Sequence, residues 1–239
     1  MIEMLASSMR SLTQRHEILA NNLANASTPG YKADGFVLSS PHGASANAAG
    51  WAVAASEDAP GSGWTDFSPA AIRRTERELD VAIDGSGFLV VQTPRGLRYT
   101  RGGALSVRPD GTLVNPAGFP VLGERGQITL RSAKTEITNE GEVQDDGQTV
   151  DQLRIVDFPK PYQLRKDSTG LLAPPRGAGD PTPATDFHVV AGALEDSNVG
   201  SVRTMVQMIE LLRSYESAQR AIQAADEADR YVSNDMGRV

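Results

Sequence analysis

The 239-residue sequence has no cysteine and only three histidines, which are scattered along the chain. The chain therefore cannot form disulfides or use thiolate chemistry, and it lacks the clustered histidines that a His-based metal site needs. A formal net charge of −7 argues against a nucleic-acid partner, because nucleic acid favours a basic stripe. No apolar run approaches the roughly 18 residues of a membrane span, and the N-terminus lacks the pattern of a cleaved signal peptide. We expect no membrane insertion.

An amphipathic pattern opens the chain. An isolated helix gains little stability unless its apolar stripe packs against a partner. A repeat near 3.5 residues places the repeating side chains on one such stripe. In this segment the steps alternate between three and four, interrupted only by His16, and the apolar members are Ile2, Leu5, Met9, Leu12, Leu19 and Leu23. The pattern predicts a helix whose stripe packs against a partner.

The segment that follows is Ala20-Asn-Asn-Leu-Ala-Asn-Ala-Ser-Thr-Pro-Gly-Tyr-Lys32. Pro29 cannot continue a helix, and Gly30 permits the turn that follows. Asparagine is a poor helix residue because its amide competes for backbone hydrogen bonds. The amides could either fray the helix end or bond across a helix–helix contact and fix its register, as buried asparagine does in coiled coils. The second interpretation adds three residues to the interface: Asn21, Asn22 and Asn25.

The C-terminal part of the chain provides a counterpart helix. No proline occurs from Val199 to Val232, and Ser197 or Asn198 suits the N-cap. At about 1.5 Å per residue this helix is roughly 50 Å long, too long for the core of a small β-domain. Its apolar face is wide enough for more than one neighbour. One stripe contains Val202, Met205, Ile209 and Leu212, and a second contains Met208, Leu211, Tyr215, Ala218, Ile222 and Ala225.

The sequence between the two predicted helices falls into two parts of different composition. Residues 33–70 are rich in small residues, proline and glycine, which predicts an extended connector anchored by Trp51 and Trp64. From Leu79 to Phe158, short apolar runs alternate with turn sequences, which predicts short antiparallel strands with barrel-like closure, followed by a loop at 171–186. The predicted fold is α+β. A β-rich domain at 79–195 is inserted between helical termini at 1–30 and 196–239 that pair as a coiled-coil-like bundle, with the connector at 31–78.

Three stretches of the chain resemble bacterial flagellar rod and hook proteins. The first is the N-terminal helix with its motif at residues 20–32. The second is the run that starts at Leu79-Asp-Val-Ala-Ile-Asp-Gly-Ser-Gly-Phe88 and continues to Leu122, and the third starts at Gly192-Ala-Leu-Glu-Asp-Ser-Asn-Val199. Together they cover most of the chain apart from residues 39–65. Asp66-Phe-Ser-Pro69 and the modest length most resemble the proximal-rod branch of the family, with the distal-rod branch next.

The resemblance implies a structural subunit of the basal-body rod that polymerises helically through its terminal helices into part of a hollow drive shaft for motility. It implies copies of the chain itself, other rod proteins and the flagellar type III export apparatus as partners. It also implies a location in the rod across the periplasm and export without a cleaved signal. No catalysis, cofactor or small-molecule substrate is implied.

Two alternatives remain open from the sequence. One is a distal-rod or hook paralogue. The other is an enzyme acting on cell-wall carbohydrate, with the helices as a coiled-coil stem. Glu140 and Glu142 motivate the second, because glycosidases use a pair of carboxylates. Acidic residues are common on strand surfaces, so the pair by itself favours no catalytic role.

Overall fold

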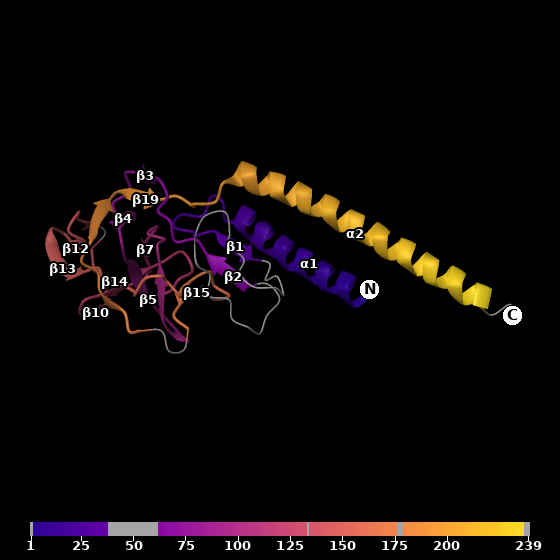
Figure 1. The fold of residues 1–239 in the computed structure, drawn as a ribbon. Helices are drawn as coiled ribbons and strands as arrows, with labels where there is room; N and C mark the ends of the chain where they lie inside the picture. The colour runs from indigo at the N-terminus through magenta and orange to yellow at the C-terminus, as the bar shows by residue number, and fades with distance from the viewer. Residues whose placement is uncertain (1, 38–61, 133, 176–178, 237–239) are drawn as a thin grey trace. The chain divides into compact units, whose positions relative to one another are not determined.

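The computed structural model describes residues 2–37, 62–132, 134–175 and 179–236 (Figure 1). The fold is α+β, as predicted, with helices α1 (Ile2–Ala24) and α2 (Ser201–Met236) at the two ends and antiparallel strands between them. The chain divides into two compact units. The terminal-helix unit comprises residues 1–24, 34–64 and 199–239, and the β-unit comprises residues 25–33 and 65–198. The domain boundaries proposed from the sequence stay a prediction.

In the terminal-helix unit, α1 contacts α2 and also contacts strand β1 (Asp34–Val37). β1 forms a two-stranded sheet with β2 (Ser62–Thr65). A Cβ atom on Gly35 would lie 2.4 Å from the Trp64 indole, so the ring rests directly on the glycine backbone. Trp64 therefore packs within the connector, against β1, and its role as an anchor to another part of the chain stays a prediction. Trp51 lies outside the described residues.

The β-unit contains many short strands, and every pairing recorded within it is antiparallel. Its largest sheet has six strands in the order β15-β16-β6-β5-β14-β17. The strands of this unit are β3 (Ile72–Arg74), β4 (Val81–Gly85), β5 (Phe88–Thr93), β6 (Gly96–Thr100), β7 (Ser106–Val107), β8 (Leu113–Val114), β9 (Leu122–Gly123), β10 (Gly126–Gln127), β11 (Thr135–Ile137), β12 (Glu142–Asp145), β13 (Gln148–Gln152), β14 (Ile155–Asp157), β15 (Arg165–Lys166), β16 (Leu172–Ala173), β17 (Thr182–Pro183), β18 (Phe187–Ala191) and β19 (Ala193–Glu195).

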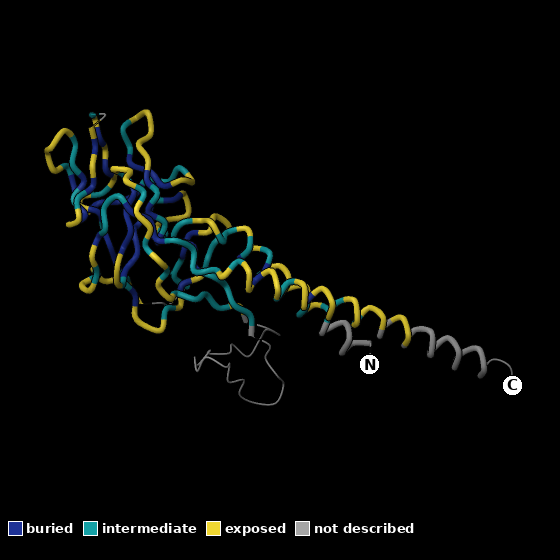
Figure 2. The backbone as a smooth tube through the Cα atoms, turned by 90° about the horizontal axis from the view of Figure 1, so that it is seen from above, coloured by how far each residue is buried: buried dark blue, intermediate teal, exposed yellow. Residues whose placement is uncertain are grey.

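Two hydrophobic clusters hold the β-unit together, and its buried backbone stands out in dark blue in Figure 2. The larger cluster is aliphatic and includes Val91, Leu113 and Val121, which are fully buried. The smaller one is aromatic, and the rings of Tyr99 and Phe158 meet edge to face with centroids 4.8 Å apart. Such contacts add to the burial of apolar surface. The β-unit therefore has a core of its own.

The structure corrects two expectations about the β-unit and adds two strands that were not expected. In the part that is described, the main sheet ends in edge strands β15 and β17 and does not close into a barrel. The predicted loop at 171–186 contains β16 and β17, and Pro183 sits on an edge strand, where its missing N–H is tolerated. β18 and β19 were not expected. They pair with β4 and β3, segments about a hundred residues earlier, so local patterns do not indicate them.

Candidate assembly surface of the terminal helices

The buried face of α1 is wider than the apolar stripe predicted for it, which we call the seam. Leu19 is buried, Leu12 and Leu23 are partly buried, and His16 is exposed. Ile18, which is not on the seam, is also partly buried, and its Cδ1 atom lies 3.9 Å from where a Cβ atom on Gly63 of β2 would be. The β1–β2 ribbon therefore widens the contact face. Met9 is partly buried, and the side chains of Ile2 and Leu5 lie outside the described residues.

α2 buries one face. Leu211 is 4% exposed and Thr204 is 6% exposed. Met208 and Tyr215 are partly buried on the same face. α1 is the main neighbour of α2 in the described chain, so we assign this face to α1. The second predicted stripe is thus the one covered within the chain, and the side chain of Ile222 lies outside the described residues.

A second face of α2 is apolar and exposed. We call this face the exposed stripe. Its residues have exposed fractions of about half or more: Val202 (75%), Met205 (50%), Val206 (50%), Ile209 (53%) and Leu212 (47%). The first half of α2 shows this exposure in yellow in Figure 2. A third face is polar and carries Arg203, Glu210 and Ser214. A contiguous exposed apolar surface on a soluble chain typically marks an interaction site.

The asparagines of the motif act within the chain. The Asn22 side chain is buried at the end of α1, donates from Nδ2 to the Asp34 carbonyl at 2.7 Å and accepts the Asp34 N–H at 2.9 Å. This pair of bonds imitates a strand pairing and ties the connector to the helix end. Asn21 is exposed, and Asn25 is partly buried and accepts a hydrogen bond from the Thr28 hydroxyl. A contact of these amides with another subunit remains a prediction.

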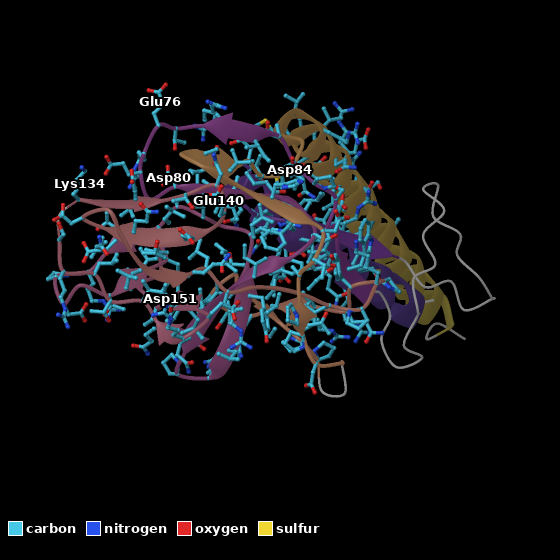
Figure 3. All side chains as sticks on the ribbon, turned by 90° about the vertical axis from the view of Figure 1, so that its left-hand side faces the viewer. Glu76, Asp80, Asp84, Lys134, Glu140 and Asp151 are labelled. Carbon is cyan, nitrogen blue, oxygen red and sulfur yellow. The ribbon has the colours of Figure 1, made fainter. Side chains whose placement is uncertain are left out.

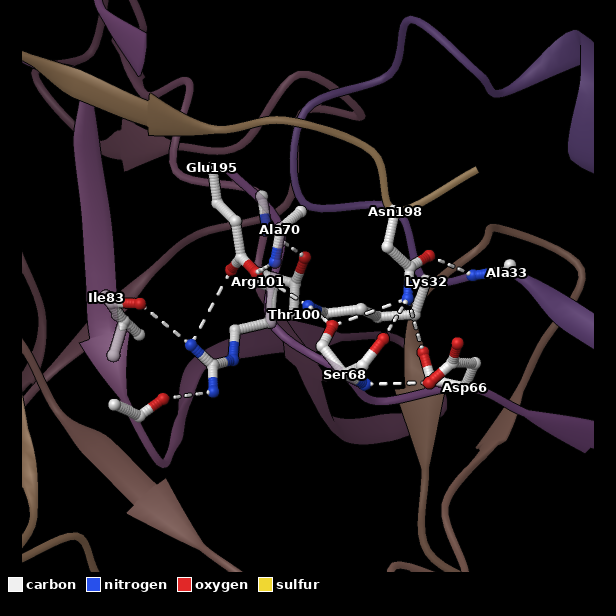
Figure 4. Close-up of polar contacts among 12 residues, drawn as sticks. Lys32, Ala33, Asp66, Ser68, Ala70, Ile83, Thr100, Arg101, Glu195 and Asn198 are labelled. Carbon is white, nitrogen blue, oxygen red and sulfur yellow. Dashed lines mark hydrogen bonds and ion pairs between the residues drawn. The ribbon is translucent and has the colours of Figure 1, made fainter. Parts of the chain in front are cut away.

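The second half of the motif enters the β-unit, where Lys32 forms a buried ion pair with Glu195 (Figure 4). The Lys32 Nζ and Glu195 Oε1 atoms are 2.6 Å apart, and both side chains are 2% exposed. Lys32 also donates to the Ser68 carbonyl at 2.7 Å. Burial lowers the pKa of Lys32 below its ordinary value, and the Glu195 carboxylate opposes this shift.

Arg101, which is 7% exposed, completes this cluster. One guanidinium nitrogen lies 3.6 Å from the Glu195 Oε2 atom and donates to the Ile83 carbonyl at 2.9 Å. The other donates to the Gly85 carbonyl at 2.6 Å. The sequence interpretation missed all three charged residues. The available signal was their position, since each lies inside one of the three family-like stretches.

The predicted N-cap of α2 is wrong, because α2 begins at Ser201 and the Asn198 amide is used elsewhere. Asn198 Oδ1 accepts the Ala33 N–H at 2.6 Å, and Nδ2 donates to the Asp66 carbonyl at 2.9 Å. An amide that is engaged with two distant backbone groups cannot also cap the helix. Asn198 therefore joins the start of the connector to the segment that leads into α2.

Figure 3 labels several acidic residues of the β-unit. Asp80 and Asp84 belong to the segment of β4, Glu140 lies in the turn before β12, and Asp151 lies in β13. Glu142 accepts a hydrogen bond from the Thr149 hydroxyl on the neighbouring strand. Over the described ranges, no group of three or more metal-ligating side chains is placed to hold an ion. No described helix is long and apolar enough to cross a membrane.

Comparison with known proteins matches all three parts of the chain. The family profile described as "Flagella basal body rod protein" matches residues 2–32. "Flagellar hook protein FlgE/F/G D1 domain" matches residues 82–149, and "Flagellar basal body rod FlgEFG protein C-terminal" matches residues 190–235. These matches include α1 with its motif, much of the β-unit, and most of α2.

Individual relatives extend over nearly the whole chain. The flagellar basal-body rod protein FlgF of Caulobacter vibrioides is 31% identical over 235 residues, covering 96% of each chain. FlgF of Salmonella typhimurium is 35% identical and covers 88% of this chain and 87% of the relative. The rod protein FlgG of Buchnera aphidicola is 31% identical, with coverage of 88% and 89%. The family is structural, which removes the cell-wall enzyme alternative, and the chain therefore belongs to the flagellar basal-body rod proteins as a FlgF-like member.

Proposed function

We propose that this chain is a structural subunit of the bacterial flagellar basal-body rod and polymerises helically through its terminal helices, forming part of the hollow drive shaft for motility. The observation that carries this proposal is the exposed stripe of α2. α2 already has one neighbour, α1, yet keeps a second apolar face in water. A helix with two apolar faces suits a subunit whose second face is covered by the next copy.

The proposed packing is coiled-coil-like. Three–four spacing in α1 and in both stripes of α2 is the spacing that knobs-into-holes packing uses. The sequence predicts a subunit interface on both helices and at the asparagines beside them, comprising Ile2, Leu5, Met9, Leu12, Leu19, Asn21, Asn22, Leu23, Asn25, Val202, Met205, Met208, Ile209, Leu211, Leu212, Tyr215 and Ile222. Leu19, Asn22 and Leu211 are buried within the free chain, so in this proposal they support the interface from inside the subunit and the exposed stripe meets the next copy.

The exposed stripe can stabilise such a contact appreciably. Full burial of a Val, Leu, Ile or Met side chain contributes about 1.5–3 kcal/mol. About half of each stripe side chain remains in water in the free chain. Each residue can therefore contribute roughly half of that amount when a neighbour covers it. In a helical polymer every subunit repeats the contact, so the gain recurs at each interface.

The proposed partners are copies of this chain, other rod proteins and the flagellar type III export apparatus. The proposed location is the basal-body rod where it crosses the periplasm. The names of the relatives support this assignment.

The experiment replaces the chromosomal copy with variants and scores swimming and the composition of purified basal bodies. Leu212→Asp places a carboxylate in the exposed stripe, where burial carries a desolvation cost of several kcal/mol. We expect basal bodies that lack the chain and cells that do not swim. Ser214→Asp is the matched control, since it adds the same charge to the exposed polar face of the same helix. Normal rods and motility with Leu212→Asp would overturn the proposal.

A further inference from the structure

Two chain segments that are far apart in sequence run side by side within the β-unit. The Gly30 N–H donates to the Glu195 carbonyl at 2.7 Å, and the Asn198 N–H donates to the Tyr31 carbonyl at 3.3 Å. These segments lie where the chain passes between the β-unit and the terminal helices, after α1 and before α2. The point where the chain enters the β-unit after α1 and the point where it continues toward α2 are therefore adjacent.

The charged cluster of Lys32, Arg101 and Glu195 lies at these two points (Figure 4). Each charge comes from a different segment: the motif after α1, the turn after β6, and the end of β19. Lys32 and Glu195 are 163 residues apart in sequence. A buried charge is costly unless it is paired, so the cluster can close only when all three segments are in place.

The cluster is not arranged for maximal stability. Among the described residues, the buried Glu195 Oε2 and Arg101 Nε atoms have no hydrogen-bond partner. A partly satisfied buried ionic cluster is weak evidence for stabilisation, since apolar residues of similar volume often serve at least as well. The best-attested use of such a group is to select one register among several. Chain ends that lead into two assembling helices are a place where register matters.

A second contact holds the same residues in place. The Lys166 ammonium lies 3.7 Å from the centroid of the Tyr31 ring and also donates to the Lys32 carbonyl. The cation over the ring is an attractive arrangement. Lys166 belongs to edge strand β15, so the motif contacts the main sheet as well as β19.

We propose that Lys32, Arg101 and Glu195 form a chain-end clasp. The clasp holds the segment after α1 against the segment before α2, and so fixes, within the β-unit, the point where the chain enters after α1 and the point where it continues toward α2. These are positioning residues, distinct from the helical interface itself. The consequence for rod assembly rests on the proposed function, whereas the clasp is a property of the single chain.

Hydrogen exchange on the full-length purified chain tests the clasp. We expect Lys32→Met to raise exchange at the amides of Gly30 and Asn198 by about tenfold or more while the amides of β5 stay protected, because the substitution opens the chain ends and not the β-core. Arg98→Met is the matched control. It removes the Arg98–Asp167 ion pair, whose atoms are 2.9 Å apart and whose side chains are 16% and 15% exposed. We expect it to leave the exchange of both chain-end segments unchanged.

A second arm separates a clasp from a merely stabilising pair. The double variant Lys32→Met/Glu195→Gln removes both charges, so its unfolding equilibrium should change by less than the product of the two single changes. In the double variant we expect exchange at the Gly30 and Asn198 amides to stay raised even where global stability is regained. The double variant also replaces Lys32→Met in the test if that single variant fails to fold. Exchange that rises uniformly over the β-unit, or not at all, would overturn the clasp. Neither result depends on rod assembly, so a failure of the proposed function would be separate.

Discussion

Leu211 and Leu212 are adjacent leucines whose truncation should destabilise the free chain to very different extents. Leu211 is 4% exposed and Leu212 is 47% exposed, so the first is covered within the chain and the second is half in water. Leu211→Ala should destabilise the pairing of α1 with α2 by about 2–5 kcal/mol, the usual range for a buried leucine. Leu212→Ala should cost less than about 1.5 kcal/mol in the free chain. Both substitutions change helix propensity equally, so that contribution cancels.

The measurement is hydrogen exchange of the helix amides in dilute monomer, because two separate units make a single melting temperature ambiguous. Each 1.4 kcal/mol should accelerate exchange about tenfold. Leu211→Ala should therefore accelerate exchange more than Leu212→Ala in both helices, by about twofold at the low end of these ranges and by more than tenfold toward the high end. In cells, Leu212→Ala should still weaken rod assembly, although it costs the free chain little stability. Equal effects on the free chain would refute the assignment of the two faces.

Three further outcomes follow. Leu12→Asp, on the seam of α1, should abolish assembly in sedimentation while the near-UV CD of the β-unit is unchanged; assembly that persists would show that the seam is no interface. Gly30→Ala should destabilise the chain by more than about 1 kcal/mol in denaturant titration, because φ is +69° and the new Cβ atom would lie 2.3 Å from neighbouring backbone, whereas Gly96→Ala meets no atom within 4 Å and should cost less. Burial and the hydrogen bond to Asp157 raise the pKa of Tyr162 to about 12. Between about pH 10 and 12 the folded chain keeps this proton and the unfolded chain loses it, so stability falls with pH in this window, and Tyr162→Phe should flatten that fall; an unchanged slope would contradict it.

Local sequence determined much of this protein. The three–four spacing from Leu5 to Leu23 is enough to predict α1. Pro29 and Gly30 suit no helix interior, and α1 ends a few residues before them, at Ala24. The alternation of short apolar runs with turn residues predicts the antiparallel β-region. The two apolar stripes of α2 are also visible from spacing alone, so most candidate interface residues could be named before the fold was known.

Tertiary structure decided which residues those patterns bring together. Spacing cannot show which stripe of α2 faces α1, because both stripes have the same period, and only the burial of Leu211 against the exposure of Leu212 distinguishes them. Nor does any local pattern join Lys32 to Glu195 or turn Asn198 away from the helix start. Their partners lie more than a hundred residues away, and these contacts form only when the β-unit is folded. Periodicity is a property of neighbouring residues, whereas the cost of burying a charge depends on what the folded chain places beside it.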